Sequence, residues 1–174
     1  MQWKVELCAA LHEEATAFMA ETILVIDDDP GMLDFLKQRL IPEGFTVSTA
    51  ASGKDGINEA MIHQPDLILL DLVMPTQDGM TVCQALRANP KTQSIPIIVV
   101  TGILSPSHLR EAMASGADDF VSKPVDLTDL LIRIRAMLEC RMIEDRVERF
   151  ARYTEIALEA ASKFSRLHPP ATKE

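Results

Sequence analysis

Aromatic residues and cysteines are few in this chain of 174 residues. It has one tryptophan, one tyrosine and six phenylalanines, although hydrophobic residues make up 47% of the sequence, so aliphatic side chains and methionine must form most of the core. The three cysteines, Cys8, Cys83 and Cys140, lie far apart and have none of the short spacings that mark zinc sites or redox pairs. This composition predicts an ordinary globular protein in a reducing, cytoplasmic environment.

Positive charge is also scarce. The net charge is -9 and no cluster of five or more lysines and arginines occurs, so we expect no direct contact with nucleic acid. The amino terminus has no cationic start, and Glu13 and Glu14 interrupt its apolar stretch, so we expect neither a signal peptide nor a membrane-spanning segment. The length leaves room for one domain with its own core and a small appendage.

Short apolar runs alternate with amphipathic segments five times along the chain. The runs at residues 24–26, 67–70 and 97–100 are continuously apolar, as expected for central strands of a parallel sheet with helices on both faces. The run FTVST, residues 45–49, alternates more and is typical of an edge strand. The pattern predicts an α/β fold, a doubly wound (βα)5 domain over residues 21–139.

Two segments flank this domain. In residues 1–20, apolar residues recur at roughly helical spacing, which indicates either a docking helix or an optional extension: Trp3, Leu7, Leu11, Ala15 and Phe18. In residues 140–168, a longer stripe repeats at steps of four and three, as in a coiled coil: Ile143, Val147, Phe150, Thr154, Ala157, Ala161 and Phe164. Residues 169–174 are predicted to form a flexible tail.

The C-terminal stripe predicts a long helical extension. Acid-before-base pairs at i,i+4, among them Asp145 with Arg149, favour an exposed helix, so we expect the last helix of the domain to run on through residues 140–168. Its buried face rotates near residues 140–142, and there we expect the helix to leave the domain. Two interpretations of the stripe stay open, namely a homodimer through this helix and packing of the helix onto residues 1–18.

Polar residues follow four of the predicted strands at the point where each strand ends: Asp27, Asp28, Asp71, Thr101 and Lys123. In open parallel sheets, ligands bind beyond the carboxyl ends of the strands, so we expect these side chains to lie together. Three carboxylates in one place repel each other, and this calls for a cation. Hard oxygen ligands suit Mg²⁺, and the lysine adds a second positive charge.

This set of groups has the parts for covalent phosphoryl transfer. Asp71 is the candidate nucleophile, while the metal and Lys123 neutralise the phosphoryl oxygens and Thr101 donates a hydrogen bond to one of them. The other acidic residues have simpler interpretations. We assign Asp29 to helix capping, Asp78 with Gly79 to a turn that begins a helix, and the pair at residues 118–119 to a solvated loop.

Four motifs resemble the receiver domain of two-component response regulators, the CheY-like family, over residues 22–138: ILVIDDDP, DLILLDLVMPTQDG, PIIVVTG and DFVSKPVD. The resemblance implies a flavodoxin-like sheet with strand order 2-1-3-4-5. It also implies that Asp71 accepts a phosphoryl group from a histidine kinase or phosphotransfer protein. Such a receiver catalyses only its own Mg²⁺-dependent phosphorylation and dephosphorylation, and it signals through contacts with other proteins.

The resemblance also implies a role for each site residue. It gives four Mg²⁺ ligands, three carboxylates and one backbone carbonyl: Asp27, Asp28, Asp71 and Val73. Thr101 and Lys123 are implied to contact the phosphoryl group. With Thr101, Phe120 is implied to act as the switch, and the Lys123–Pro124 peptide bond is implied to be cis.

Several functions compete at this point. A single-domain regulator, a phosphorelay intermediate and a receiver module of a larger effector protein all fit the motifs. A distant alternative is a haloacid-dehalogenase-like phosphatase, because residues 27–29 also match its Asp-x-Asp pattern. That family requires an acidic pair after its lysine, whereas residues 118–119 precede Lys123, and it would leave Asp71 without a role.

Overall fold

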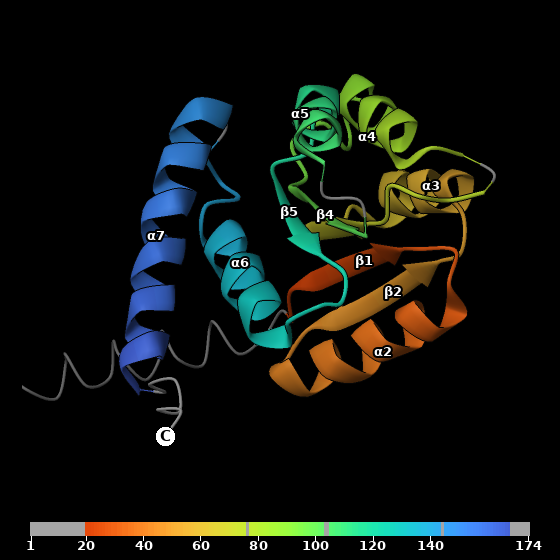
Figure 1. The fold of residues 1–174 in the computed structure, drawn as a ribbon. Helices are drawn as coiled ribbons and strands as arrows, with labels where there is room; N and C mark the ends of the chain where they lie inside the picture. The colour runs from red at the N-terminus through yellow and green to blue at the C-terminus, as the bar shows by residue number, and fades with distance from the viewer. Residues whose placement is uncertain (1–19, 76, 103–104, 144, 168–174) are drawn as a thin grey trace, which may run out of the picture.

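The computed structural model describes residues 20–75, 77–102, 105–143 and 145–167, and its centre is a five-stranded parallel sheet (Figure 1). The strands are β1 (Thr22–Ile26), β2 (Thr46–Ala50), β3 (Leu67–Leu70), β4 (Ile97–Thr101) and β5 (Asp119–Ser122). Their order in the sheet is β2-β1-β3-β4-β5, and every neighbouring pair is parallel. The predicted (βα)5 fold and its strand order are confirmed, with β2 at an edge.

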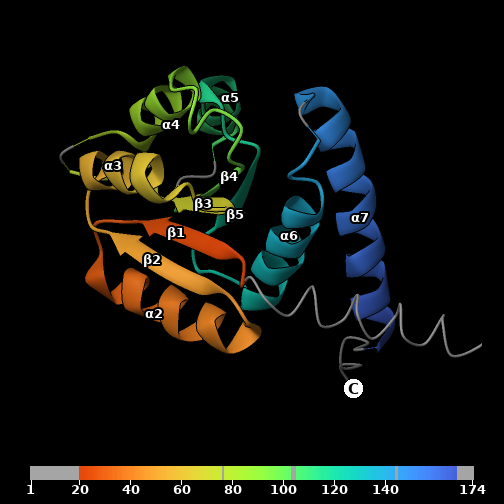
Figure 2. The same ribbon diagram turned by 180° about the vertical axis from the view of Figure 1, so that it is seen from behind.

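Helices cover both faces of the sheet, as Figure 2 shows from behind. On one face lie α2 (Pro30–Leu40) and α6 (Leu127–Glu139), and on the other lie α3 (Gly53–His63), α4 (Gly79–Ala88) and α5 (Pro106–Ser115). A one-turn 3-10 helix, Ile41–Glu43, follows α2. The two faces hold separate apolar cores, so each central strand has buried side chains on both sides.

The division of β1 explains why the central runs are apolar throughout. Ile23 and Val25 pack into the core under α2 and α6, whereas Leu24 and Ile26 pack into the core under α3, α4 and α5. Because successive side chains of a strand point to opposite faces, a strand covered on both faces leaves no position for a polar residue. The first polar residue after β1 therefore stands where the strand leaves the sheet.

Local signals set the helix ends close to the site. The side chain of Asp29 accepts a hydrogen bond from Gly31 N at 2.8 Å, which confirms it as the N-cap of α2. Asp78 caps α4 in the same way, and accepts from Met80 N at 3.1 Å. A Cβ atom on the next residue, Gly79, would lie 2.3 Å from the backbone oxygen of Asp71. The start of α4 therefore packs directly against the end of β3.

The predicted single long helix is wrong. Helix α6 ends at Glu139, residues 140–142 form a turn, and α7 (Arg146–Leu167) runs back beside α6 in the opposite direction (Figures 1 and 2). The side chain of Asp145 accepts from Val147 N at 2.9 Å and from Glu148 N at 2.8 Å, so it begins a new helix. The rotation of the buried face near Cys140 marks this turn, and α7 packs on its own domain.

The face that α7 presents to the domain matches the predicted stripe only in part, since Ile143 and Ala157 of the stripe pack against the core. Arg149 and Tyr153 are each only 3% exposed, whereas the stripe residues Val147 and Phe150 are 79% and 50% exposed. No helix of the described residues is long and apolar enough to cross a membrane. The predicted helical pattern in residues 1–18 and the predicted tail lie outside the described residues and stay predictions.

Candidate functional site

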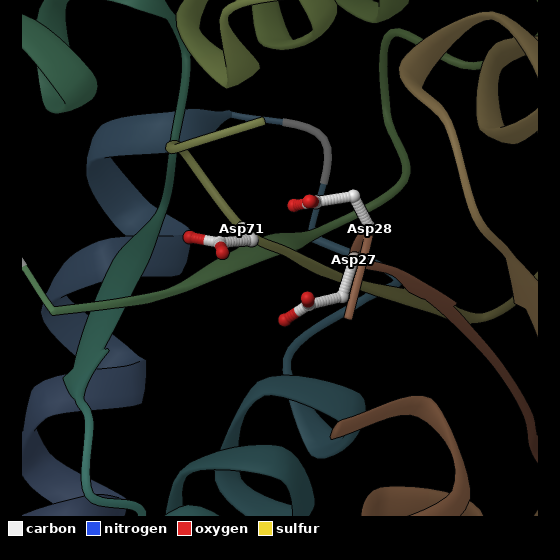
Figure 3. Close-up of side chains that lie close together, drawn as sticks. All are labelled: Asp27, Asp28 and Asp71. Atoms are coloured by element: carbon white, nitrogen blue, oxygen red, sulfur yellow. The ribbon is translucent and has the colours of Figure 1, made fainter. Parts of the chain in front are cut away.

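The ends of β1 and β3 lie side by side and bring the predicted carboxylates together. Ile26 pairs with Leu70, and Asp71 N donates to the carbonyl of Ile26 at 2.9 Å, so the two residues that follow the strands are neighbours. Figure 3 shows the side chains of Asp27, Asp28 and Asp71 converging from these two strand ends. Asp27 and Asp71 are 2% and 6% exposed, and Asp28 is more exposed.

Lys123 lies between the two buried carboxylates. Its Nζ is 2.7 Å from Asp27 Oδ2 and 2.7 Å from Asp71 Oδ2. The backbone N–H of Lys123 donates to the carbonyl of Thr101 at 2.9 Å, which ties the end of β5 to the end of β4. The Lys123–Pro124 bond is cis, as predicted. Four of the predicted site residues thus come from the ends of β1, β3, β4 and β5.

Burial and ion pairing act in opposite directions here. Burial raises the pKa of Asp27, and the hydrogen bonds from Lys123 and from the amide of Asp29 offset this only in part. Burial lowers the pKa of Lys123, but its hydrogen bonds to Asp27 and Asp71 outweigh that effect and leave the pKa raised. The lysine is therefore held as a cation, and the three carboxylates still carry more negative charge than it neutralises.

The donor set fits a hard divalent cation. One ligand oxygen each from Asp27, Asp28 and Asp71 can be chosen so that all lie within 4.8 Å of one another. A small cluster of carboxylate oxygens that is open to water on one side suits Mg²⁺, which keeps several waters when it binds to proteins. The backbone N–H of Val73 donates to Asp71 Oδ1 at 3.2 Å, so the segment after β3 folds back over this aspartate.

The remaining predicted residues lie on β4 and β5. Thr101 is the last residue of β4, is fully buried and pairs with Ser122, the last residue of β5. Phe120 pairs with Val99 and packs, partly buried, against the core under α3, α4 and α5. Thr101 therefore adjoins the site directly, while Phe120 lies on β5, three residues before Lys123.

Residues 118–119 do not form the predicted solvated loop. Asp118 is 7% exposed, with Arg87 Nη2 at 2.7 Å and the amide of Ile97 at 2.9 Å from its Oδ2. Asp119 is 8% exposed, begins β5, and accepts from Arg133 Nη1 at 2.6 Å. The sequence signal was the apolar pair that follows, which places these acids at the start of a strand rather than in a loop.

The comparisons with known proteins agree with this geometry. The family model described as "Response regulator receiver domain" matches residues 23–135. The "DNA-binding dual master transcriptional regulator RpaA" of Synechocystis sp. is 40% identical over 134 residues, which are 77% of this chain and 54% of that protein. "Response regulator ArlR" of Staphylococcus aureus is 36% identical over 126 residues, which are 72% of this chain and 56% of that protein. The chain thus spans about half the length of these curated relatives.

Solved structures give the same result. The "response regulator receiver domain protein (CheY-like)" from Methanospirillum hungatei JF-1 has a TM-score of 0.67 and 31% identity, with 73% of this chain and 100% of that chain covered. Chemotaxis protein CheY4 of Vibrio cholerae has a TM-score of 0.65 and 27% identity, with 67% and 98% covered. These matches favour a receiver over a haloacid-dehalogenase-like phosphatase.

One of these relatives bears on the predicted partners. The Synechocystis relative is named as DNA-binding, which conflicts in part with the prediction that no nucleic acid is bound. That name describes a longer protein, of which this chain matches about half. What the matched residues share with it is the receiver domain. The chain therefore belongs to the response regulator receiver family.

Proposed function

We propose that Asp71 accepts a phosphoryl group from a histidine kinase or phosphotransfer protein and that the chain then signals through contacts with other proteins. One observation carries the proposal. A buried aspartate directly follows β3 with Lys123 Nζ at 2.7 Å, and oxygens of two further carboxylates lie within 4.8 Å of it. A strand end holds its side chain rigidly, so the nucleophile needs no reorganisation before it attacks.

The transfer step uses this chain's own groups. A carboxylate oxygen of Asp71 bonds to the phosphorus atom while the phosphorus–nitrogen bond of the donor histidine breaks, and the imidazole leaves with that electron pair. The ammonium of Lys123 lies 2.7 Å from Asp71 Oδ2, so it is close enough to pair with the oxygens of a phosphoryl group bound to Asp71. We assign the buried hydroxyl of Thr101 as a donor to one of those oxygens.

Asp27, Asp28 and Asp71 would hold Mg²⁺, together with the backbone carbonyl of Val73. When bound, the ion supplies positive charge that stabilises the oxygens around the phosphorus during transfer. The excess of carboxylates over the single ammonium supports this assignment. We also propose that the chain catalyses its own phosphorylation and dephosphorylation in this way and is not otherwise an enzyme.

Thr101 and Phe120 form the proposed switch. Thr101 pairs with Ser122, and Phe120 lies two residues earlier on the same strand, so a shift of Thr101 toward a phosphoryl group acts on β5. Phe120 has no hydroxyl, so its response must come from a change of packing. It is only partly buried where it packs against the core under α3, α4 and α5.

We propose that the output is a protein contact in the cytoplasm. The net charge of -9 supports a protein partner over direct contact with DNA. Cys140 is a buried, free thiol, which agrees with a reducing compartment. A phosphorelay intermediate and a receiver module of a larger effector protein are the alternative outputs.

A homodimer through the C-terminal helix is a further part of the proposal. On α7, Val147, Phe150 and Leu158 are 79%, 50% and 71% exposed. Exposed apolar side chains along one side of a helix are typical of a protein contact. Light scattering of the full chain and of a version that ends at Glu139, with and without Mg²⁺ and beryllofluoride, would measure the association.

Intact mass spectrometry tests the phosphorylation itself. The chain is incubated with Mg²⁺ and acetyl phosphate, and we expect one phosphoryl adduct that Asp71→Asn abolishes. Asp78→Asn is the matched control, because Asp78 is an exposed aspartate near the site and asparagine caps a helix equally well. An adduct that persists in Asp71→Asn would place the acceptor elsewhere and overturn the proposal.

A further inference from the structure

Helix α7 rests on a surface at the edge of the sheet beside β5. We call this the α7-docking surface and define it by Ser94, Met113, Asp118, Asp119 and Met137. It combines the start of β5 and the loop before β4 with one side of α5 and of α6. Figures 1 and 2 both place α7 along α6 on this side of the molecule.

Two polar side chains of α7 reach into this surface. Arg149 is 3% exposed, its Nη1 donates to the carbonyl of Ser94 at 2.9 Å, and its Nη2 is 3.8 Å from Asp118 Oδ1. One turn further along, Tyr153 is 3% exposed and its hydroxyl donates to Asp119 Oδ2. A buried guanidinium and a buried phenol are costly unless they are paired, so these two contacts fix the position of α7 on the surface.

Apolar contacts accompany these two polar contacts. Ile156 and Ala157 of α7 pack against the core under α2 and α6. Beside Arg149, a pocket of about 300 Å³ is open to solvent, and Val147 and Phe150 at its rim are 79% and 50% exposed. Solvent therefore reaches the edge of the docked helix.

The same short strand connects this surface to the phosphoacceptor site. Strand β5 has four residues, begins at Asp119 and is followed directly by Lys123. Asp119 contacts Tyr153 of α7, and Lys123 contacts Asp27 and Asp71. A strand of this length spans only about 13 Å. If Lys123 moves toward a phosphoryl group on Asp71, β5 moves with it, and the position of Asp119 at the other end of the strand changes.

We propose that the α7-docking surface is a helix-binding site that α7 occupies within the same chain, with Arg149 and Tyr153 as the residues that determine which helix binds. Phosphorylation of Asp71 releases α7 and opens the surface to a partner helix that presents an arginine and a tyrosine one turn apart. The release step rests on the function proposed above, whereas the docking does not.

Hydrogen exchange of the full chain tests the docking. Arg149→Ala removes the contacts of the guanidinium with Ser94 and Asp118, and Tyr153→Phe removes the hydrogen bond to Asp119. For each variant we expect amide exchange in residues 147–160 to become at least about tenfold faster while β1, β3 and β4 stay protected. Arg152→Ala is the matched control, because Arg152 is exposed on the same helix and pairs only with Glu155 among the contacts found for it. Equal exchange in Arg149→Ala and Arg152→Ala would overturn the assignment of Arg149.

A labelled peptide of residues 146–167 tests whether the surface can accept a helix from outside. We expect it to bind the full chain in Mg²⁺ and beryllofluoride, which stands in for the phosphoryl group, more tightly than the chain in Mg²⁺ alone, and at least about tenfold more tightly than a peptide with Arg149→Ala. A peptide that binds equally well with and without its arginine would overturn the proposed specificity.

Beryllofluoride also separates the release step from the phosphorylation itself. We expect it to speed exchange in α7 in the wild type and to have no effect in Asp71→Asn. If Asp71 is phosphorylated as proposed but α7 exchange stays unchanged, the release step is wrong. If Asp71 takes no phosphoryl group, the proposed function fails and the release fails with it, while the comparison of Arg149→Ala with Arg152→Ala decides the docking independently.

Discussion

Replacement of Gly79 by alanine tests how the fold holds the phosphoacceptor. A Cβ atom there would lie 2.3 Å from the backbone oxygen of Asp71 and 2.6 Å from Cα of Leu72, whereas ordinary contacts begin at 3.4 Å. Both contacts are with backbone, so no flexible side chain can move aside. The end of β3 and the start of α4 must separate by about 1 Å.

The expected cost follows from this overlap. Forcing a methyl group into a packed site costs about 1–3 kcal/mol, and the better helix propensity of alanine returns at most about 1 kcal/mol. We expect a net loss of about 1–2 kcal/mol, which lowers the melting temperature by about 2–8 °C for a chain of this size. We also expect slower phosphorylation from acetyl phosphate, because Asp71 no longer lies opposite Lys123.

Gly102→Ala is the matched control, measured by thermal denaturation and by the rate of adduct formation. Gly102 follows Thr101 at the same edge of the sheet, but among the described residues no atom beyond its chain neighbours lies within 4 Å of the position where its Cβ would be. We expect a change in stability within about 0.5 kcal/mol for this variant. If Gly79→Ala melts at the same temperature as Gly102→Ala, the packing argument is wrong.

Three further predictions concern the charged and polar groups. Lys123→Met removes the ammonium that lies 2.7 Å from Asp27 and from Asp71. In urea denaturation we expect the free energy of unfolding to fall by about 2 kcal/mol, and we expect Mg²⁺ to restore part of this loss. Equal stability of the variant and the wild type would contradict the prediction. Asp28→Asn should weaken Mg²⁺ binding, as measured by calorimetry. It should leave the midpoint of urea denaturation unchanged, because this carboxylate is the most exposed of the three. A large loss of stability would instead assign Asp28 a structural role. Burial and a neighbouring carboxylate raise the pKa of Tyr153 above 10.0, so its contribution to stability is present below about pH 10 and is lost as the pH rises toward the folded-state pKa. It is the single tyrosine of the chain, so ultraviolet difference spectra should find no phenolate at pH 10 in the folded protein and about half ionisation in denaturant; a phenolate in the folded protein at that pH would refute the burial.

The sheet and the site were predictable from sequence because both depend on local patterns. Continuous apolar runs identify strands that are covered on both faces, and the first polar residue after each run marks where a strand leaves the sheet. Asp27, Asp71 and Lys123 were found in this way, and the structure brings them to within hydrogen-bond distance of one another through the lysine. Their assignment needed no knowledge of packing.

The C-terminal helix was predicted less well because its pattern fits two arrangements. Acid–base pairs at i,i+4 stabilise an isolated helix and a docked helix equally, so Asp145 with Arg149 gave no sign of the turn. In the structure these two residues have separate roles. Asp145 caps the start of α7, and Arg149 is buried in contact with residues 94 and 118. A buried arginine on a polar face depends on a distant acceptor, which the local sequence does not reveal.

The most direct test of the central claim is fluorine NMR of the chain with beryllofluoride. Bound beryllofluoride stands in for the phosphoryl group on Asp71, and Mg²⁺ is expected to be required for it to bind. We predict resonances of the bound complex in the wild type and in Asp78→Asn that disappear in Asp71→Asn and when Mg²⁺ is chelated. Bound resonances that persist in Asp71→Asn, or that do not depend on Mg²⁺, would contradict the assignment of Asp71 as the phosphoacceptor.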